Sequence, residues 1–210
     1  MEYNGMPKNR AIEGVKAAMP PSRFATSPRE HGARAMTEYR DHHATIFVAP
    51  AIAGPIEAVR REWDPAMAAQ IAAHVTVAYP QEAPISDLLV ERVRAASAGI
   101  PPFRLRLGRV ATFGSPEDGV YVTVEDIDGG YRKIREEVLR PPFHGVAFPP
   151  HVTLVHPRTS GRGGDFRDSG WSLCGDEEFV AQEVAITALD GARWVVLETF
   201  RLRGEGERRS

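Results

Sequence analysis

Two histidines of this chain occur in the same short pattern. Residues 73–80 read AHVTVAYP and residues 150–157 read PHVTLVHP. Each copy has a His-Val-Thr triplet followed by a proline four residues after the threonine. The whole chain has only 7 histidines, so two matching copies indicate an internal duplication of a strand–helix–strand unit rather than coincidence.

The alternation of a β-strand decides where these side chains point. Residues i and i+2 project from the same face, so His74 and Thr76 point together, as do His151 and Thr153. If the duplication places the two strands side by side, two imidazoles and two hydroxyls face one cleft. The residues between and after them point the other way and should be buried; they are Val75, Val77, Val152 and Leu154.

This set of side chains suits phosphodiester chemistry. An imidazole titrates near neutral pH, so one histidine can take a proton from water while the other gives one to the leaving oxygen. The threonine hydroxyls can donate hydrogen bonds to the phosphate oxygens as negative charge builds on them. No metal ion or cofactor is needed for these steps, and we expect none.

On these two motifs the chain resembles the 2H phosphoesterase superfamily, most closely its 2′–5′ RNA ligase-like branch. The resemblance spans residues 44–202. It implies a bilobal, duplicated α+β fold in which two antiparallel sheets flank a central cleft and helices lie outside. It also implies that His74 is the acid acting on the leaving 3′ oxygen and His151 the base acting on water, with Thr76 and Thr153 beside them.

The activity implied by this resemblance is hydrolysis of 2′,3′-cyclic phosphates, on RNA ends or small nucleotides, to 2′-phosphomonoesters. The reverse type of reaction, joining RNA ends through a 2′–5′ linkage, stays open because one site can catalyse both directions. A nucleotide-binding module without turnover is the third alternative. We expect a monomer whose partner is a nucleotide or an RNA end.

Four residues that flank the motifs are candidates for substrate binding. Tyr79 and Phe148 could stack on a base, and His156 could line the pocket. Arg158 could pair with a phosphate. The alternative is ordinary structure, with the two aromatic residues in the core and Arg158 as a surface charge.

A metal site is the main rival explanation for a group of histidines. His144 and His156 lie near His151, but no Asp, Glu or Cys accompanies either motif at ligand spacing. We therefore expect no metal. The adjacent pair His42 and His43 is expected to be solvated.

Composition excludes several classes of protein. The 210 residues carry 26 Lys+Arg and 28 Asp+Glu, a net charge of -2, which argues against coating duplex DNA. Arg104 and Arg106 should form a solvated strand face, or a basic strip leading RNA to the cleft. The single cysteine, Cys174, forms no intrachain disulfide, and no apolar run reaches the ~20 residues that span a bilayer. We expect a cytoplasmic protein without membrane contact.

The local patterns divide the chain into three parts. Residues 1–43 are expected to form a disordered arm, 44–203 the domain, and 204–210 a tail. Within the domain the glycine-rich stretch 160–170 is expected to be a flexible loop, and Asp190-Gly191 marks a hairpin. We expect strands at 45–48, 74–79, 103–107, 120–124, 152–155, 179–189 and 194–202, and helices at 55–63, 86–98 and 131–138.

Overall fold

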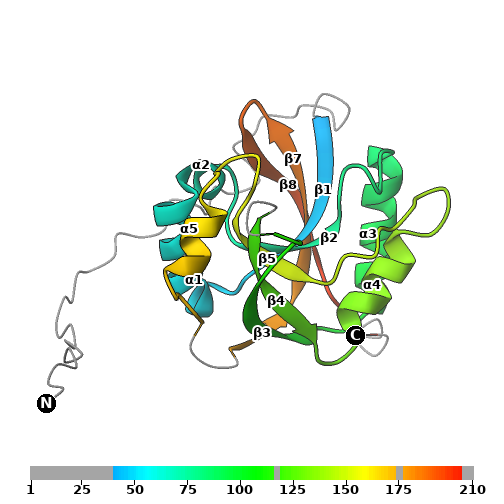
Figure 1. The fold of residues 1–210 in the computed structure, drawn as a ribbon. Helices are drawn as coiled ribbons and strands as arrows, with labels where there is room; N and C mark the ends of the chain where they lie inside the picture. The colour runs from blue at the N-terminus through cyan, green and yellow to red at the C-terminus, as the bar shows by residue number, and fades with distance from the viewer. Residues whose placement is uncertain (1–39, 116–118, 174–176, 205–210) are drawn as a thin grey trace, which may run out of the picture. The chain divides into compact units, whose positions relative to one another are not determined.

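Two four-stranded sheets carry the fold (Figure 1). The computed structural model describes residues 40–115, 119–173 and 177–204, all within the unit that spans 33–210. In the first sheet the strand order is β2 (His74–Ala78), β1 (Arg40–Phe47), β7 (Glu183–Asp190) and β8 (Arg193–Arg201). In the second sheet it is β5 (His151–Val155), β4 (Val120–Asp126), β3 (Phe103–Thr112) and β6 (Glu178–Ala181). All neighbouring strands are antiparallel.

Five helices connect and cover these strands in the part of the chain that is described. They are α1 (Pro50–Trp63), α2 (Pro65–Gln70), α3 (Ser86–Gly99), α4 (Gly130–Val138) and α5 (Gly163–Asp168). In Figure 1, α3 and α4 lie on one side of the sheets, and α1, α2 and α5 lie on the other. The α+β class predicted from the sequence, with two antiparallel sheets and outer helices, is confirmed.

The topology repeats. β1 is followed by α1, α2 and the antiparallel partner β2, and β4 is followed by α4 and the antiparallel partner β5. β2 and β5 are the edge strands of their sheets, and they contact each other. The duplicated unit therefore places its two His-Val-Thr strands side by side.

The core lies behind the motif side chains. Val75, Val77, Val152 and Leu154 are all fully buried, as strand alternation predicts. In β3 the same alternation buries Leu105 and Leu107 while Arg104 stays exposed.

The first strand begins earlier than the sequence pattern indicates. β1 starts at Arg40, four residues before the expected domain boundary. It is extended because it pairs with β7, with His43 opposite Thr187. The prediction that His42 and His43 are solvated is wrong: they are only 4% and 6% exposed. The rest of the expected arm (1–39), most of the expected tail (205–210) and Cys174 lie outside the described residues.

Two other segments differ from the local pattern. The glycine-rich stretch 160–170 contains α5, because Phe166 is buried against Trp63 and Trp171, at ring-centroid distances of 5.4 and 5.8 Å. The single strand expected at 179–189 is two strands. β6 pairs with β3 in the second sheet, and after Gln182 the chain crosses to the first sheet as β7.

None of the helices in the described ranges is long and apolar enough to cross a membrane.

Candidate active site

The two motif histidines are held in the same way at the start of β2 and β5. Nδ1 of His74 lies 2.7 Å from the carbonyl oxygen of Ala72, and Nδ1 of His151 lies 2.8 Å from that of Pro149. A carbonyl oxygen only accepts hydrogen bonds, so Nδ1 is the donor in both rings. Nε2 is therefore the atom of each ring that gains or loses a proton.

Burial keeps both imidazoles neutral. It lowers the pKa of His74 to about 4; the hydrogen bond to Ala72 opposes this, and the charges of Arg60 and His151 add to it. Burial also lowers the pKa of His151 below its ordinary value, against the opposing hydrogen bond to Pro149. The strands that carry the two rings, β2 and β5, contact each other.

The threonine of the first motif contacts a third histidine. Thr76 Oγ1 lies 3.0 Å from Nε2 of His43, and Nδ1 of His43 lies 3.1 Å from Oγ1 of Thr45. The His43 ring packs 5.3 Å from the ring of His74 and 5.1 Å from that of Trp194. His43 is thus a part of the site rather than a surface residue.

Tyr79 links the two motifs. Its phenol oxygen lies 3.3 Å from Nε2 of His151. Burial raises the pKa of Tyr79, so the phenol is protonated at neutral pH and can donate to His151. The predicted site residue Tyr79 therefore lies between the two motifs.

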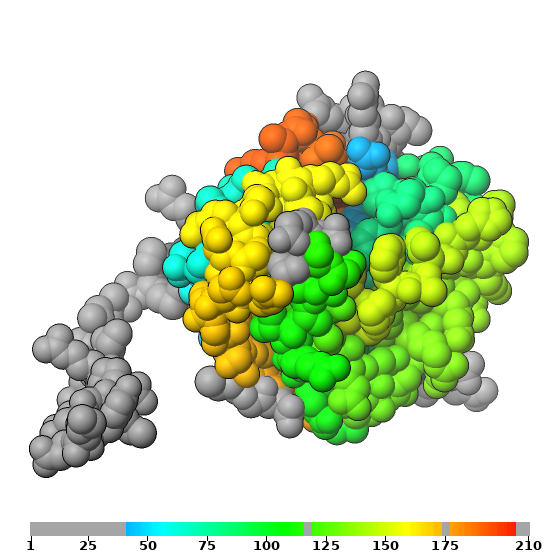
Figure 2. All heavy atoms as spheres, viewed as in Figure 1, coloured from blue at the N-terminus to red at the C-terminus, as the bar shows by residue number. Residues whose placement is uncertain are grey.

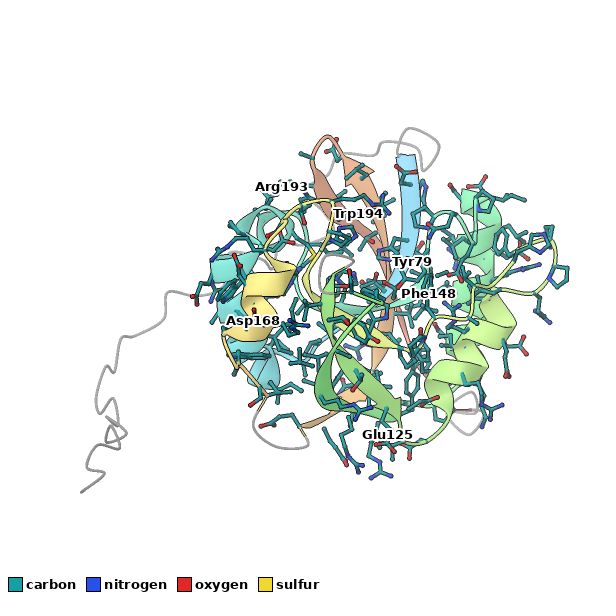
Figure 3. The ribbon with its side chains drawn as sticks, viewed as in Figure 1. Tyr79, Glu125, Phe148, Asp168, Arg193 and Trp194 are labelled. Carbon is teal, nitrogen blue, oxygen red and sulfur yellow. The ribbon has the colours of Figure 1, made fainter. Side chains whose placement is uncertain are left out.

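Aromatic rings surround the second motif. Phe113 and Tyr121 pack 4.8 and 5.1 Å from the His151 ring and 4.3 Å from each other. Phe148 lies 5.9 Å from Tyr79 and is 43% exposed. Figure 3 shows Tyr79 and Phe148 next to each other, with Trp194 above them in this view. This partly exposed aromatic surface beside the histidines is suited to stacking against a planar ring.

A buried carboxylate positions both aromatic residues of this pair. Glu82 accepts hydrogen bonds from the backbone N–H of Tyr79 and of Val146, at 3.0 and 2.6 Å. It is also ion-paired with Arg135 at 2.8 Å. The loop that carries Phe148 is therefore fixed relative to Tyr79. In Figure 2, yellow atoms of the segment that follows β5 and green atoms of the β3–β4 region lie next to each other on this face.

His156 and Arg158 belong to a loop that the structure anchors elsewhere. The His156 N–H donates to buried Asp64 at 2.8 Å, and its Nδ1 accepts from the Arg158 N–H at 3.1 Å. Asp64 also accepts from the Thr159 hydroxyl and caps α2. Among the described residues, no hydrogen bond or ring contact joins His156 or Arg158 to His74 or His151. Of the four flanking residues, Tyr79 and Phe148 are therefore brought to the motifs, and these two are not.

Arg104 and Arg106 of β3 are neutralised by carboxylates. Arg104 pairs with Asp128 at 2.9 Å, and Arg106 pairs with Glu125 and Glu178 at 3.0 and 2.5 Å. The solvated strand face is the better description, since a basic strip needs uncompensated charge. Across the described ranges no three His, Cys, Asp or Glu side chains are grouped so that they could hold a metal ion.

Sequence reasoning missed His43, Thr45, Phe113, Tyr121 and Trp194 as residues around the site. The signal for the first two was present, because His43 and Thr45 alternate as strand residues do. Reading that signal required knowing that the strand extends back to Arg40. Trp194 lies on β8, and only the sheet pairing brings it near His43.

Two histidines, the Thr76 hydroxyl and a phenol that contacts Nε2 of His151 therefore lie on or next to two edge strands that contact each other, with aromatic surface beside them. Such a site can move protons at two places and donate hydrogen bonds to an anion. This combination on a duplicated two-sheet fold defines the 2H type of site. A model of the 2′-5′ RNA ligase superfamily matches residues 48–162, which include both motifs. The chain belongs to the 2′-5′ RNA ligase superfamily.

Individual relatives agree with this assignment. A Staphylococcus aureus (strain Newman) protein named "Putative phosphoesterase" is 27% identical over 160 residues, covering 70% of this chain and 90% of the relative. Among solved structures, TT0787 of Thermus thermophilus is similar with a TM-score of 0.54 and 20% identity, covering 79% of this chain and 99% of that one. E. coli LigT complexed with NADP+ has a TM-score of 0.53 and 16% identity, covering 78% and 98%. These two structures show the shared fold.

Proposed function

We propose that this protein is a phosphodiesterase that opens nucleoside 2′,3′-cyclic phosphates, free or at an RNA end, to 2′-phosphomonoesters. The observation that carries the proposal is that the rings of His74 and His151 are oriented by equivalent hydrogen bonds. In both, Nδ1 is tied to a backbone carbonyl two residues upstream, which leaves two Nε2 atoms as an acid and a base. The nucleotide complexes of E. coli LigT, with NADP+, ATP and 3′-AMP, support a nucleotide as ligand.

The proposed reaction moves two protons and exchanges one bond. Water attacks the phosphorus, and Nε2 of His151 accepts the proton that water loses. The bond from phosphorus to O3′ breaks, and Nε2–H of His74 protonates that oxygen. Thr76 and Thr153 donate hydrogen bonds to the non-bridging oxygens, whose charge grows in the transition state. The contact between Tyr79 and His151 supports this assignment, because a phenol that donates to Nε2 favours the unprotonated form needed in a base.

A second candidate is the joining of RNA ends. The family description names 2′-5′ RNA ligases, and a 5′-hydroxyl in place of water would give a 2′–5′ linkage by the same proton transfers. The partly exposed Phe148 beside Tyr79 could hold either a mononucleotide or the last base of a strand. Since both reactions start from the same cyclic phosphate, one substrate tests both.

The test is incubation with 2′,3′-cyclic AMP and with an RNA ending in a 2′,3′-cyclic phosphate, with and without a 5′-hydroxyl oligonucleotide. Phosphorus NMR then reports where the phosphate ends. A 2′-monophosphate supports the phosphodiesterase, and a 2′–5′ diester supports the ligase. Nucleotide binding without any product would contradict both proposed enzymatic activities. The remaining function would then be nucleotide binding without turnover.

His74→Ala and His151→Ala should each lower kcat at least ~100-fold, the usual scale for one proton-transfer group. The wild-type protein should keep its turnover in EDTA, because the acid, the base and the hydroxyl donors are all side chains of the protein. Near-normal turnover in a folded His151→Ala protein would contradict the two-histidine mechanism, and loss of activity in EDTA that a divalent ion restores would contradict its metal independence.

A further inference from the structure

His43 is a histidine that the proposed reaction does not use. It lies on β1, with one ring nitrogen against the Thr76 hydroxyl and the other against the Thr45 hydroxyl, at 3.0 and 3.1 Å. It is 6% exposed, and Trp194 and Tyr79 pack against its ring. Burying an imidazole costs free energy unless both nitrogens are satisfied, and here two hydroxyls satisfy them.

The direction of the hydrogen bonds at the opposite end of the site can be derived first. The carbonyl oxygen of Pro149 must accept, so Nδ1 of His151 carries a proton. In the neutral ring Nε2 of His151 is then an acceptor, and the phenol of Tyr79 donates to it. A phenol has one proton, so the Tyr79 oxygen has none left to give and can only accept from a further donor.

The same reasoning continues to β1. In the proposed reaction the Thr76 hydroxyl donates to the substrate phosphate, so its oxygen must accept from Nε2–H of His43. His43 is neutral because burial, and the charge of His74 to a lesser degree, hold its pKa well below the ordinary value. A neutral imidazole with its proton on Nε2 has an acceptor at Nδ1. The Thr45 hydroxyl therefore donates to Nδ1.

We propose that His43 is a positioning residue which, as its Nε2–H tautomer, holds the Thr76 hydroxyl with its proton directed into the cleft. It does so within a one-directional hydrogen-bond chain, defined here as Thr45, His43 and Thr76. This inference rests on the proposed function, in which the Thr76 hydroxyl donates to the substrate phosphate. The opposite tautomer would make Thr76 donate to His43 and present lone pairs to an anion.

Among the described residues at β4, none orients Thr153 of the second motif as His43 orients Thr76. Thr45 lies opposite Thr76 on β1 and β2, as Tyr121 lies opposite Thr153 on β4 and β5. Two residues before Thr45 stands His43, and two residues before Tyr121 stands Gly119. A glycine has no side chain to orient Thr153. His43 is therefore an addition to one half of the duplication, and its loss should act through Thr76 alone.

The activity test uses 2′,3′-cyclic AMP and the full-length protein. His43→Leu should lower kcat/KM on the order of 10-fold to 100-fold, mainly through kcat, as should Thr76→Val. The double variant should be no worse than Thr76→Val alone, because His43 acts through that hydroxyl. His43→Gln should recover part of the loss, since its amide can donate to Thr76 and accept from Thr45. If His43→Leu does not fold, Thr45→Val and His43→Gln test the same chain.

His42→Leu is the matched control. His42 is also a buried histidine of β1, but it points away from the cleft, and its Nδ1 contacts Ser86 at 2.7 Å. Loss of this imidazole should leave kcat/KM close to that of the wild type. A folded His43→Leu protein with wild-type kcat/KM, or a double variant whose loss is the sum of both single losses, would overturn the proposal.

A second measurement does not depend on turnover. Nitrogen-15 NMR of the histidine rings in the free protein should show His43 with its proton on Nε2 and Nδ1 unprotonated. The opposite tautomer would overturn the proposal even in an active enzyme. If 2′,3′-cyclic AMP is not hydrolysed, the proposed function fails separately, and the chain is then tested by binding of adenosine 2′-monophosphate. His43→Leu and Thr76→Val should weaken that binding equally, and unchanged binding in His43→Leu would again overturn the proposal.

Discussion

At the scale of single residues, the pKa values of the two motif histidines set the pH range of the reaction. Productive binding needs His74 protonated and His151 neutral, yet the pKa of both is lowered, that of His74 to about 4. At neutral pH most of the free enzyme therefore lacks the proton that His74 must give. A bound phosphate anion stabilises a nearby positive charge, so it should raise the pKa of His74 in the complex.

The pH dependence of kcat/KM should therefore be a bell whose maximum lies below pH 6.5. On the basic limb of the bell, kcat/KM should fall about tenfold per pH unit as His74 loses its proton, because kcat/KM reports the free enzyme. The basic limb of kcat should lie at higher pH, because kcat reports the complex. Initial rates on 2′,3′-cyclic AMP between pH 4.5 and 8.5 measure both. A kcat/KM that rises from pH 6 to pH 8 would contradict these protonation states.

Single residues were predictable where a pattern repeated. The burial of the valines and the leucine between the motif residues follows from alternation within one short segment. Tyr79 follows from its place just after the first motif. His43 did not, because the position of its ring depends on β7 and β8, which are more than a hundred residues away in the sequence. A local reading of His42-His43 beside a proline-rich arm gives no sign of that pairing.

At the scale of elements, α1 fixes the backbone that orients His74. Arg60 is 1% exposed, pairs with Glu57 at 3.0 Å, and donates to the carbonyl oxygen of Ile71 at 2.7 Å. Glu57 accepts from the N–H of Ala73. Between these two anchors lies Ala72, whose carbonyl holds His74 Nδ1. The helix therefore determines where the proposed acid points.

Arg60→Met should destabilise the protein by roughly 3 kcal/mol, because it leaves Glu57 without its partner in a partly buried position. It should also raise the pKa of His74, since the charge of Arg60 lowers it. Urea unfolding measures the first effect, and NMR titration of the His74 ring measures the second. Arg61→Met, on the exposed side of the same helix, is the control. An unchanged His74 pKa in a folded Arg60→Met protein would contradict this account.

Most elements could be predicted from the local sequence pattern, because prolines mark their ends and alternating apolar residues mark the strands. The exceptions depend on tertiary contacts. α5 forms in a glycine-rich stretch because burial of Phe166 against Trp63 compensates for poor helix propensity. The break at Gln182 exists because β6 and β7 belong to different sheets. The contacts that decide these two cases cannot be predicted from the sequence of the segments themselves.

At the scale of the whole molecule, the two halves of the duplication support each other's motif strand. Tyr131 and Arg135 of α4 donate to the β2 carbonyl oxygens of Thr76 and Val77, at 2.7 and 2.8 Å. In the other direction, α1 packs against β5, and Asp64 holds the N–H of His156 just after β5. Each proposed proton-transfer group is thus positioned partly by the other half. This exchange explains why the site lies where β2 and β5 meet.

This arrangement concentrates buried imidazoles, and the stability of the fold should depend on pH as a result. The pKa values of His43, His74, His151 and His156 are all lowered from 6.5, with burial as the largest cause. Below pH 6.5 the unfolded chain therefore binds more protons than the native protein. By linkage, the free energy of unfolding should fall as the pH drops from 6.5 toward 4, by up to about 1.4 kcal/mol per pH unit for each such imidazole.

Urea unfolding at pH 7.5, 6.0 and 5.0 measures this pH dependence of the free energy of unfolding. The His43→Leu variant shows how much of it the His43 ring contributes. That variant removes one group that must take up a proton on unfolding, so its free energy of unfolding should depend less steeply on pH than that of the wild type. A free energy that stays constant from pH 7.5 to pH 5.0, or equal slopes in both proteins, would mean that His43 and its neighbours are charged in the folded state. A charged His43 would donate from both nitrogens, and the Thr45 hydroxyl could then no longer donate to Nδ1. The pH dependence of stability thus tests the hydrogen-bond chain independently of any substrate.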